Sequence, residues 1–144
     1  MSNTRKTIGV CSRLLKGELS AIESYDLSLE QFDREIEQPS LRAIRDAHQV
    51  SAERLSEQLA GLGAQPATKP GIGPFAQAVA ETTSILGRFP TLAALEEGEK
   101  QTIDEYEQAL LSPDASEDIK IAIRQELLPP LSGHIAALDR LRAG

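Results

Sequence analysis

Two glutamates and two histidines of this 144-residue chain are candidates for a chemical role because of their side-chain types and their positions. Glu18 stands in the stretch "LLKGELSAIESY", where helical spacing would place an apolar residue, and Glu99, His48 and His134 occupy comparable positions further along. Carboxylates bind hard cations, and imidazole adds a neutral ligand that fixes geometry. Side chains of these two types can therefore bind iron or another divalent metal, and the alternative is a protein without a cofactor.

The residues around Glu18 predict one long amphipathic helix. From Ile8 to Ile36, apolar residues recur at a strict spacing of three and four, interrupted only by Glu18. The members of this apolar seam are Ile8, Cys11, Leu15, Glu18, Ile22, Tyr25, Leu29, Phe32 and Ile36. Pro39 ends this helix and opens a second one, which keeps helical spacing through His48 as far as the C-cap candidates Gly61 and Gly63.

The rest of the sequence predicts a long connection and two further helices. A Pro- and Gly-rich loop, "AQPATKPGIGP", is followed by a short amphipathic helix or turn over Phe75–Phe89. Pro90 opens a third helix, and a fourth runs from about residue 118 to 141, kinked or delayed by Pro129–Pro130. This order predicts an all-α fold in one domain over residues 1–144. It is a ferritin-like four-helix bundle with a long crossover between the second and third helices.

The composition excludes several classes of function. The net charge of −7 argues against nucleic-acid and anionic membrane partners. The single cysteine, Cys11, allows no internal disulfide, and we expect it to be a buried structural thiol. The N-terminal stretch "MSNTRKTIGV" lacks the apolar segment of a signal peptide, so we expect a cytoplasmic protein. We expect a monomer or a homodimer, and the sequence specifies no other protein partner.

The two halves of the chain resemble each other. "GELSAIESY" begins at Gly17 and "GEKQTIDEY" at Gly98, and each contains Gly-Glu and ends in Tyr. "HQVSAERL" begins at His48 and "HIAALDRL" at His134, and each has an acid five residues after His, followed by Arg-Leu. A duplicated helical hairpin related by a pseudo-twofold axis would explain both matches and the long crossover.

These motifs resemble a bacterial family of small ferritin-like proteins without an assigned function, and more distantly the rubrerythrin-type bundles. The resemblance covers about residues 14–141 and implies the fold, with a role in metal handling or stress. In rubrerythrin-like bundles, the first and third helices each supply a Glu and the second and fourth each supply a Glu-x-x-His motif.

Carried onto this sequence, the resemblance makes Glu18, Glu99, His48 and His134 the metal ligands. The two Glu-x-x-His carboxylates are missing, because Arg45 and Leu131 stand in their places. We expect Tyr25, Tyr106 and Arg45 to lie around these ligands and to contact them.

The heights of these residues along the bundle also bear on the site. With the first turn near residue 38, the heights of Glu18 and His48 along the bundle would differ by roughly 15 Å. With the second turn near residue 114, the heights of Glu99 and His134 would differ by about 8 Å. Together with the missing carboxylates, this favours a metal-free polar layer over a single ion, and a single ion over a dinuclear centre. In the metal-free layer Glu18 would face Glu99, with Arg13, Arg45 or Lys16 as the counter-charge.

Three functions follow from these alternatives. The first is a ferritin-like protein with a degenerate metal site, metal-associated or stress-related. The second is a rubrerythrin-type di-metal oxidase or peroxidase, and the third is a metal-free helical interaction module.

Overall fold

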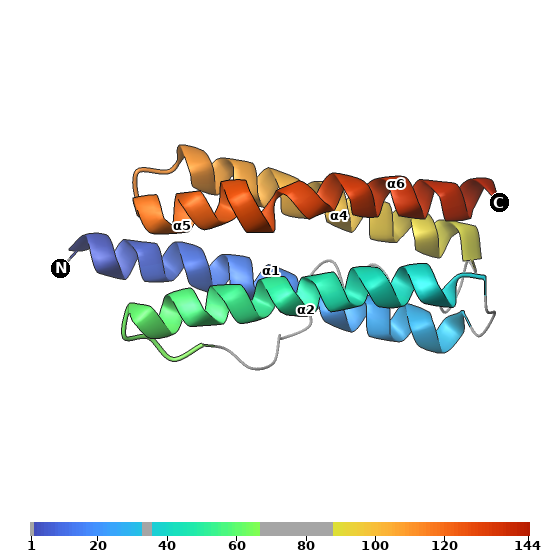
Figure 1. Cartoon of the computed structure of the whole chain (residues 1–144), viewed down its shortest axis with the longest axis horizontal. Helices are drawn as coiled ribbons and strands as arrows, with labels where there is room; N and C mark the ends of the chain where they lie inside the picture. The colour runs from blue at the N-terminus through green and yellow to red at the C-terminus, as the bar shows by residue number, and fades with distance from the viewer. Residues whose placement is uncertain (1, 33–35, 67–87) are drawn as a thin grey trace.

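The protein is an all-α four-helix bundle. The computed structural model describes residues 2–32, 36–66 and 88–144, and these ranges contain helices and no strand. The helices are α1 (Ser2–Gln31), α2 (Gln38–Gly61), α4 (Arg88–Leu111), α5 (Glu117–Ala122), the π-helical segment η1 (Ile123–Leu127) and α6 (Pro129–Ala143). The last three follow one another and together form the fourth helix of the bundle (Figure 1). In the described ranges, no helix combines the length and the apolar character needed to cross a membrane.

Two antiparallel hairpins make up the bundle. α1 packs mainly on α2, and α4 packs mainly on α6. α2 and α4 run in the same direction, so the chain between them has to connect opposite ends of the bundle (Figure 1). This is the order expected for a long crossover between the second and third helices. The predicted Pro- and Gly-rich loop and the amphipathic segment over Phe75–Phe89 lie largely outside the described residues.

The first turn comes earlier than the sequence pattern predicts. α1 ends at Gln31, Phe32 is the last buried member of its seam, and Ile36 is 66% exposed. The side-chain amide of Gln38 donates hydrogen bonds to the backbone carbonyls of Leu29 and Phe32, which satisfies the open carbonyls at the end of α1. The predicted membership of Ile36 in the seam is therefore wrong, because the chain has already turned toward α2.

The end of α2 depends on Gly63. This residue follows the C-cap and has a φ of +81°, a conformation in which a Cβ atom is strained. We expect Gly63→Ala to lower the free energy of unfolding by about 1–2 kcal/mol. Gly61→Ala, a matched control in the last position of α2 with open space around its Cβ, should raise it by about 0.5 kcal/mol. Urea unfolding of both variants measures the difference, and equal effects would contradict the assignment of the strain to Gly63.

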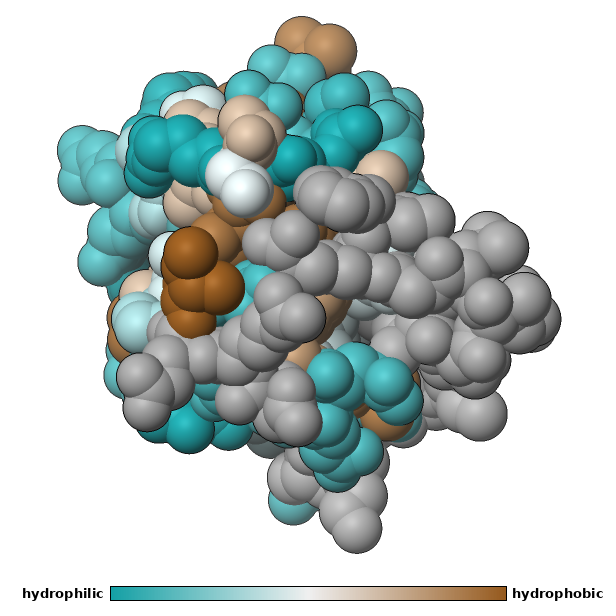
Figure 2. Space-filling view, turned by 90° about the vertical axis from the view of Figure 1, so that its right-hand side faces the viewer, coloured by the Kyte–Doolittle hydropathy of each residue, from teal (hydrophilic) through white to brown (hydrophobic). Residues whose placement is uncertain are grey.

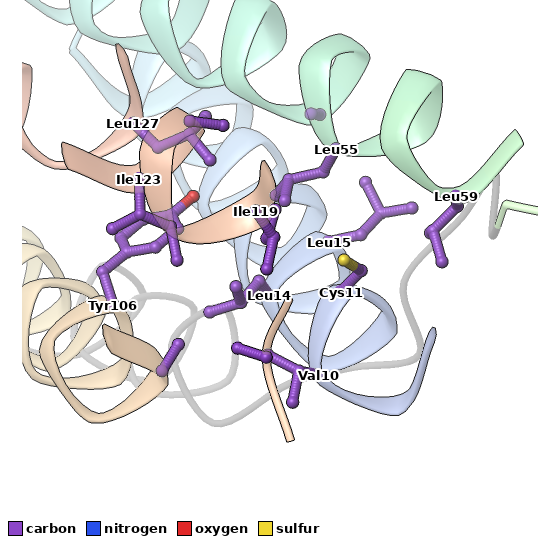
Figure 3. Close-up of a cluster of buried hydrophobic side chains, with 14 of the residues drawn as sticks. Val10, Cys11, Leu14, Leu15, Leu55, Leu59, Tyr106, Ile119, Ile123 and Leu127 are labelled. Carbon is purple, nitrogen blue, oxygen red and sulfur yellow. The ribbon is translucent and has the colours of Figure 1, made fainter. Parts of the chain in front are cut away.

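Two hydrophobic clusters fill the bundle. The larger one joins α1, α2, α4 and the first part of the fourth helix, and Figure 3 shows Cys11, Ile119 and Tyr106 among its members. The smaller one contains Tyr25 and residues such as Leu41 from α2. Cys11 is fully buried, as predicted, and burial raises the pKa of its thiol to about 11. The candidate ligands Glu18, Glu99 and His48 are buried as well, although they belong to neither cluster.

Figure 2 views the end of the bundle at which α2 begins and α6 ends. On this face, hydrophilic residues border a small hydrophobic area. The large hydrophobic residues exposed in the described ranges are few and belong to different elements: Ile36, Val50, Leu111 and Ile121.

Candidate functional site

The four candidate ligands meet in one buried group, which we call the polar layer (Glu18, His48, Glu99 and His134). Nδ1 of His48 lies 2.5 Å from Oε1 of Glu18, and Nε2 of the same ring lies 2.7 Å from Oε2 of Glu99. Nδ1 of His134 lies 2.5 Å from Oε1 of Glu99. The side chains of both glutamates are 0% exposed and that of His48 is 1% exposed, whereas that of His134 is 11% exposed.

Glu18 and His48 meet because the first turn comes earlier in the chain than the sequence pattern predicts. The turn lies between Gln31 and Gln38, so the two residues differ in height by about three residues, or about 5 Å. A glutamate and an imidazole side chain together span that difference. The separation of roughly 15 Å expected from the sequence is therefore wrong, and its cause is the misplaced turn.

Glu99 and His134 meet with the help of a π turn. The second turn lies between Leu111 and Glu117, close to the predicted position. In η1 the backbone N–H of Leu128 donates to the carbonyl of Ile123, five residues earlier, at 2.9 Å. A π turn adds a residue to a helix with little added length, which brings His134 back toward the level of Glu99.

Pro129–Pro130 interrupts the fourth helix, as predicted, because α6 begins at Pro129 with a new first turn. The two prolines lack the N–H groups that would continue an α-helical ladder, and they directly follow the π turn. They were the only signal in the sequence for this distortion.

The two tyrosines of the repeat contact the polar layer. The hydroxyl of Tyr106 donates a 2.7 Å hydrogen bond to Oε2 of Glu18. The ring of Tyr25 stacks on His48 with centroids 5.6 Å apart. Burial, followed by the charge and hydrogen bonding of Glu99, raises the pKa of Tyr25 well above its usual value. Tyr106 thus interacts with Glu18, and Tyr25 with Glu99, so each tyrosine interacts with the glutamate of the other half of the chain. A pseudo-twofold repeat produces this crossed arrangement.

Arg45 lies outside this arrangement. Its guanidinium pairs with Asp26 at 3.0 Å and with Asp46 at 3.3 Å, and its side chain is 38% exposed. A long cationic side chain at the edge of a helix reaches water rather than entering a buried layer, since burial of its charge is costly. Arg13 and Lys16, the other cations expected near Glu18, are exposed on α1. The charge that faces the two glutamates comes instead from His48.

The contacts of His48 favour a doubly protonated ring while no metal is bound. A neutral imidazole has one N–H, yet both nitrogens of His48 lie within hydrogen-bond distance of a carboxylate oxygen. Burial alone would lower the pKa of His48, but the charges and hydrogen bonds of Glu18 and Glu99 outweigh it and raise this pKa to about 10. Burial would raise the pKa of Glu99, and the hydrogen bonds from His134 and His48 lower it instead.

The donor atoms of the polar layer fit one metal ion. His48, Glu99 and His134 each offer a ligand atom, and these atoms lie within 4.8 Å of one another. Two imidazoles and one carboxylate form a known ligand set for divalent transition metals. A dinuclear centre does not fit. The helix positions that would carry its other carboxylates hold Arg45, which faces the surface, and Leu131, which is buried in the larger hydrophobic cluster.

Comparison with known proteins finds a solved structure with a similar fold. No family model matches the chain, and no curated protein matches it. A crystal structure described as ferritin-like, diiron-carboxylate proteins from Bacillus anthracis str. Ames superposes with a TM-score of 0.73 over 99% of both chains, at 20% sequence identity. At that identity the similarity concerns the fold alone. The chain thus has the ferritin-like fold that its sequence predicts.

Proposed function

We propose that this ferritin-like protein binds one divalent transition-metal ion, iron or another, through His48, Glu99 and His134. The observation that carries the proposal is the convergence of two imidazoles on one buried carboxylate, with donor atoms within 4.8 Å of one another. The Bacillus anthracis protein of similar fold is described as a diiron-carboxylate protein, which supports a metal in such a bundle. A dinuclear site would need two carboxylates that this chain lacks, which favours one ion rather than two.

Glu18 has a different role in this proposal. It faces Nδ1 of His48, while Nε2 of the same ring faces Glu99. A histidine ligand usually donates its second N–H to a carboxylate, which fixes its tautomer and orientation. We therefore assign Glu18 to orienting His48, and Tyr106 to orienting Glu18 through its 2.7 Å hydrogen bond. Nε2 of His48 has to give up its proton before it can bind a cation, so binding weakens as the pH falls.

The test is metal content together with one ligand variant. After removal of metal and reloading with Co²⁺, elemental analysis and visible absorption should show about one ion per chain. His134→Ala should weaken binding at least about 100-fold. It should also remain folded, because His134 is the most exposed member of the polar layer and makes one hydrogen bond with it.

A control variant on the same helix is Asp139→Ala. It removes a carboxylate from the exposed face of α6 and should bind Co²⁺ as the unaltered protein does. Two ions per chain, or equal binding by His134→Ala and the unaltered protein, would contradict the proposal.

The metal-free interaction module is the second candidate, and one observation favours it. Both ring nitrogens of His48 have carboxylate partners without any metal, so the polar layer can be satisfied by a proton alone. On this alternative, Co²⁺ would not bind, and sedimentation would show a concentration-dependent oligomer such as the homodimer predicted from the sequence. For a rubrerythrin-type oxidase or peroxidase the donor set is incomplete, and we propose no such reaction.

A further inference from the structure

The first half of α1 is basic, although the chain as a whole is acidic. Residues 1–17 contain four cationic residues and no acidic one, so their formal charge is +4. Because the whole chain carries −7, the remaining residues carry −11. The four cations are all exposed: Arg5, Lys6, Arg13 and Lys16. The surface charge is therefore separated along the chain, a pattern typical of proteins that bind a charged partner.

Three of these cations form one stripe along α1. Lys6, Gly9, Arg13 and Lys16 follow one another at spacings of three and four residues, which places them on one exposed face, the basic stripe. Lys6 pairs with Asp114 at 3.8 Å. Neither Arg13 nor Lys16 has an ion-pair partner in the part of the chain that the structure describes. At Gly9 the stripe is bare, because no atom of another element lies within 4 Å of the position that a Cβ would occupy.

α4 carries a second exposed stripe of the opposite charge. Asp104, Glu107 and Leu111 are spaced three and four residues apart and are all exposed, and we call them the acidic stripe. Leu111 is 84% exposed, the highest value among the large hydrophobic residues of the described ranges. Lys100, the cation one turn before Asp104, pairs with Glu97 at 3.4 Å. The two carboxylates of the acidic stripe are thus available for another cation.

The two stripes border one groove between α1 and α4. The groove has a volume of about 460 Å³ and is lined by Arg13 of the basic stripe and by Gln108, the residue after Glu107. Its apolar lining consists of Val10, Leu14 and Ala109. A basic rim, an acidic rim and an apolar floor therefore lie side by side on one face of the bundle.

The packing of α1 on α4 sets the two stripes at matching levels. The two helices run in opposite directions (Figure 1), and Oε2 of Glu105 lies 3.4 Å from the position that a Cβ would occupy at Gly17. Counting back from Gly17, Lys16 lies level with about residue 106 and Arg13 with about residue 109. Arg13 is therefore about two residues, or about 3 Å, from the level of Glu107. The same offset relates Lys16 to residue 104.

We propose that this face is the contact of a symmetric homodimer, in which α1 of each copy lies on α4 of the other across the groove. A twofold axis along the groove is parallel to the helices, so the rotation leaves every residue at its own level. Arg13 of one copy then faces Glu107 of the second copy, and Lys16 faces Asp104. Each pair forms twice, because the contact is isologous.

The uncharged residues of the two stripes fit the same arrangement. Gly9 lies level with about residue 113, so the exposed side chain of Leu111 comes opposite the bare backbone of the second copy. A side chain that projects from one helix is thereby placed where the facing helix has none. The apolar floor of the groove is covered in both copies at once, which removes apolar surface from water.

A second copy fits this face better than an acidic protein does. An acidic partner would pair with the basic stripe and would also meet like charge at the acidic stripe, whereas a second copy satisfies both stripes. The net charge of −7 on each copy is screened over about 8 Å at physiological salt, while the proposed pairs act at contact distance. The matched part of the helices is only about 17 Å long, so we expect a weak dimer with a Kd of about 10–100 μM.

The experiment is sedimentation of the metal-free full chain from about 5 to 500 μM in about 0.15 M salt. The unaltered protein should pass from monomer to dimer over this range. Lys16→Glu and Asp104→Lys should each weaken self-association at least about tenfold, because each places like charges opposite each other twice. Arg42→Glu changes an exposed cation on α2 and should leave the Kd within about twofold.

Mixing the two weakened variants identifies the pairs. In a mixed dimer, the new glutamate of Lys16→Glu faces the new lysine of Asp104→Lys, and the unaltered Lys16 and Asp104 face each other. An equal mixture should therefore form a dimer with a Kd within about threefold of that of the unaltered protein. Pairing within one chain cannot produce this recovery, so the mixture tests contact between copies and not folding of the variants.

Three results would contradict the proposal. An unaltered protein that stays monomeric up to about 500 μM would show that the basic stripe serves another partner. Equal dimerisation of Lys16→Glu and Arg42→Glu would place the contact on another face, and a mixture that stays monomeric would exclude the proposed pairs. The dimer needs no metal and goes beyond the proposed function, which Co²⁺ binding tests separately. A chain that dimerises and also binds Co²⁺ supports both.

Discussion

Glu99→Leu is expected to lower the free energy of unfolding of the metal-free protein by about 3–5 kcal/mol. Glu99 is fully buried, and it accepts hydrogen bonds from both histidines of the polar layer. Leucine would leave the buried, charged His48 with one unpaired nitrogen and would remove the partner of His134. Urea unfolding with a metal chelator present at pH 7 measures the effect.

Two further variants separate the cause of this loss. Glu97→Leu changes the same residue type on the same helix, where the side chain is 74% exposed and pairs with Lys100, and should cost less than about 0.5 kcal/mol. Replacement of Glu18, His48, Glu99 and His134 together by leucine should recover most of the stability that the single variant loses, since no charge is then left unpaired. A single Glu99→Leu variant that loses less than about 1 kcal/mol would show that the polar layer is not held by buried ion pairs.

The sequence predicted the helices and the residues of the polar layer because both are periodic. Helical spacing depends on neighbours three and four residues away, so Leu15, Glu18 and Tyr25 could be placed on one side of α1 without any long-range information. The repeat of Gly-Glu and Tyr then related Glu18 to Glu99. Periodicity alone does not show where a helix ends, however, and Ile36 fits the pattern although it lies in the turn and is 66% exposed.

The features that the sequence did not reveal depend on contacts between distant residues. The end of α1 is fixed by the side chain of Gln38, which reaches back to the carbonyls of Leu29 and Phe32. The protonated state of His48 arises from two carboxylates that are 30 and 51 residues away in the chain. The position of Glu105 against Gly17 likewise requires the packing of α4 on α1. Helix periodicity predicts none of these three features.

The metal-free protein is expected to lose stability as the pH rises from about 6.5 to 9. The pKa of His48 is raised from 6.5 to about 10 in the folded state, so folding is favoured by protonation of this ring. That contribution is fully present below pH 6.5 and is lost progressively as the pH rises toward 10. Over the window up to pH 9, the loss should approach about 3 kcal/mol. The pKa of the buried Cys11 is raised from 9.0 to about 11, so above pH 9 this thiol would further lower the free energy of unfolding.

Glu99 acts at the other end of the pH range. Its pKa is lowered in the folded state, so its contribution is present above about pH 4.5 and is lost as the pH falls through the folded value. The metal-free protein should therefore be most stable between about pH 5 and 6.5, and urea unfolding at a series of pH values measures this profile. His48→Gln, which cannot be protonated, should remove the decrease between pH 6.5 and 9. If that variant shows the same decrease as the unaltered protein, the charge on His48 does not hold the two buried glutamates together, and another group must supply the proton.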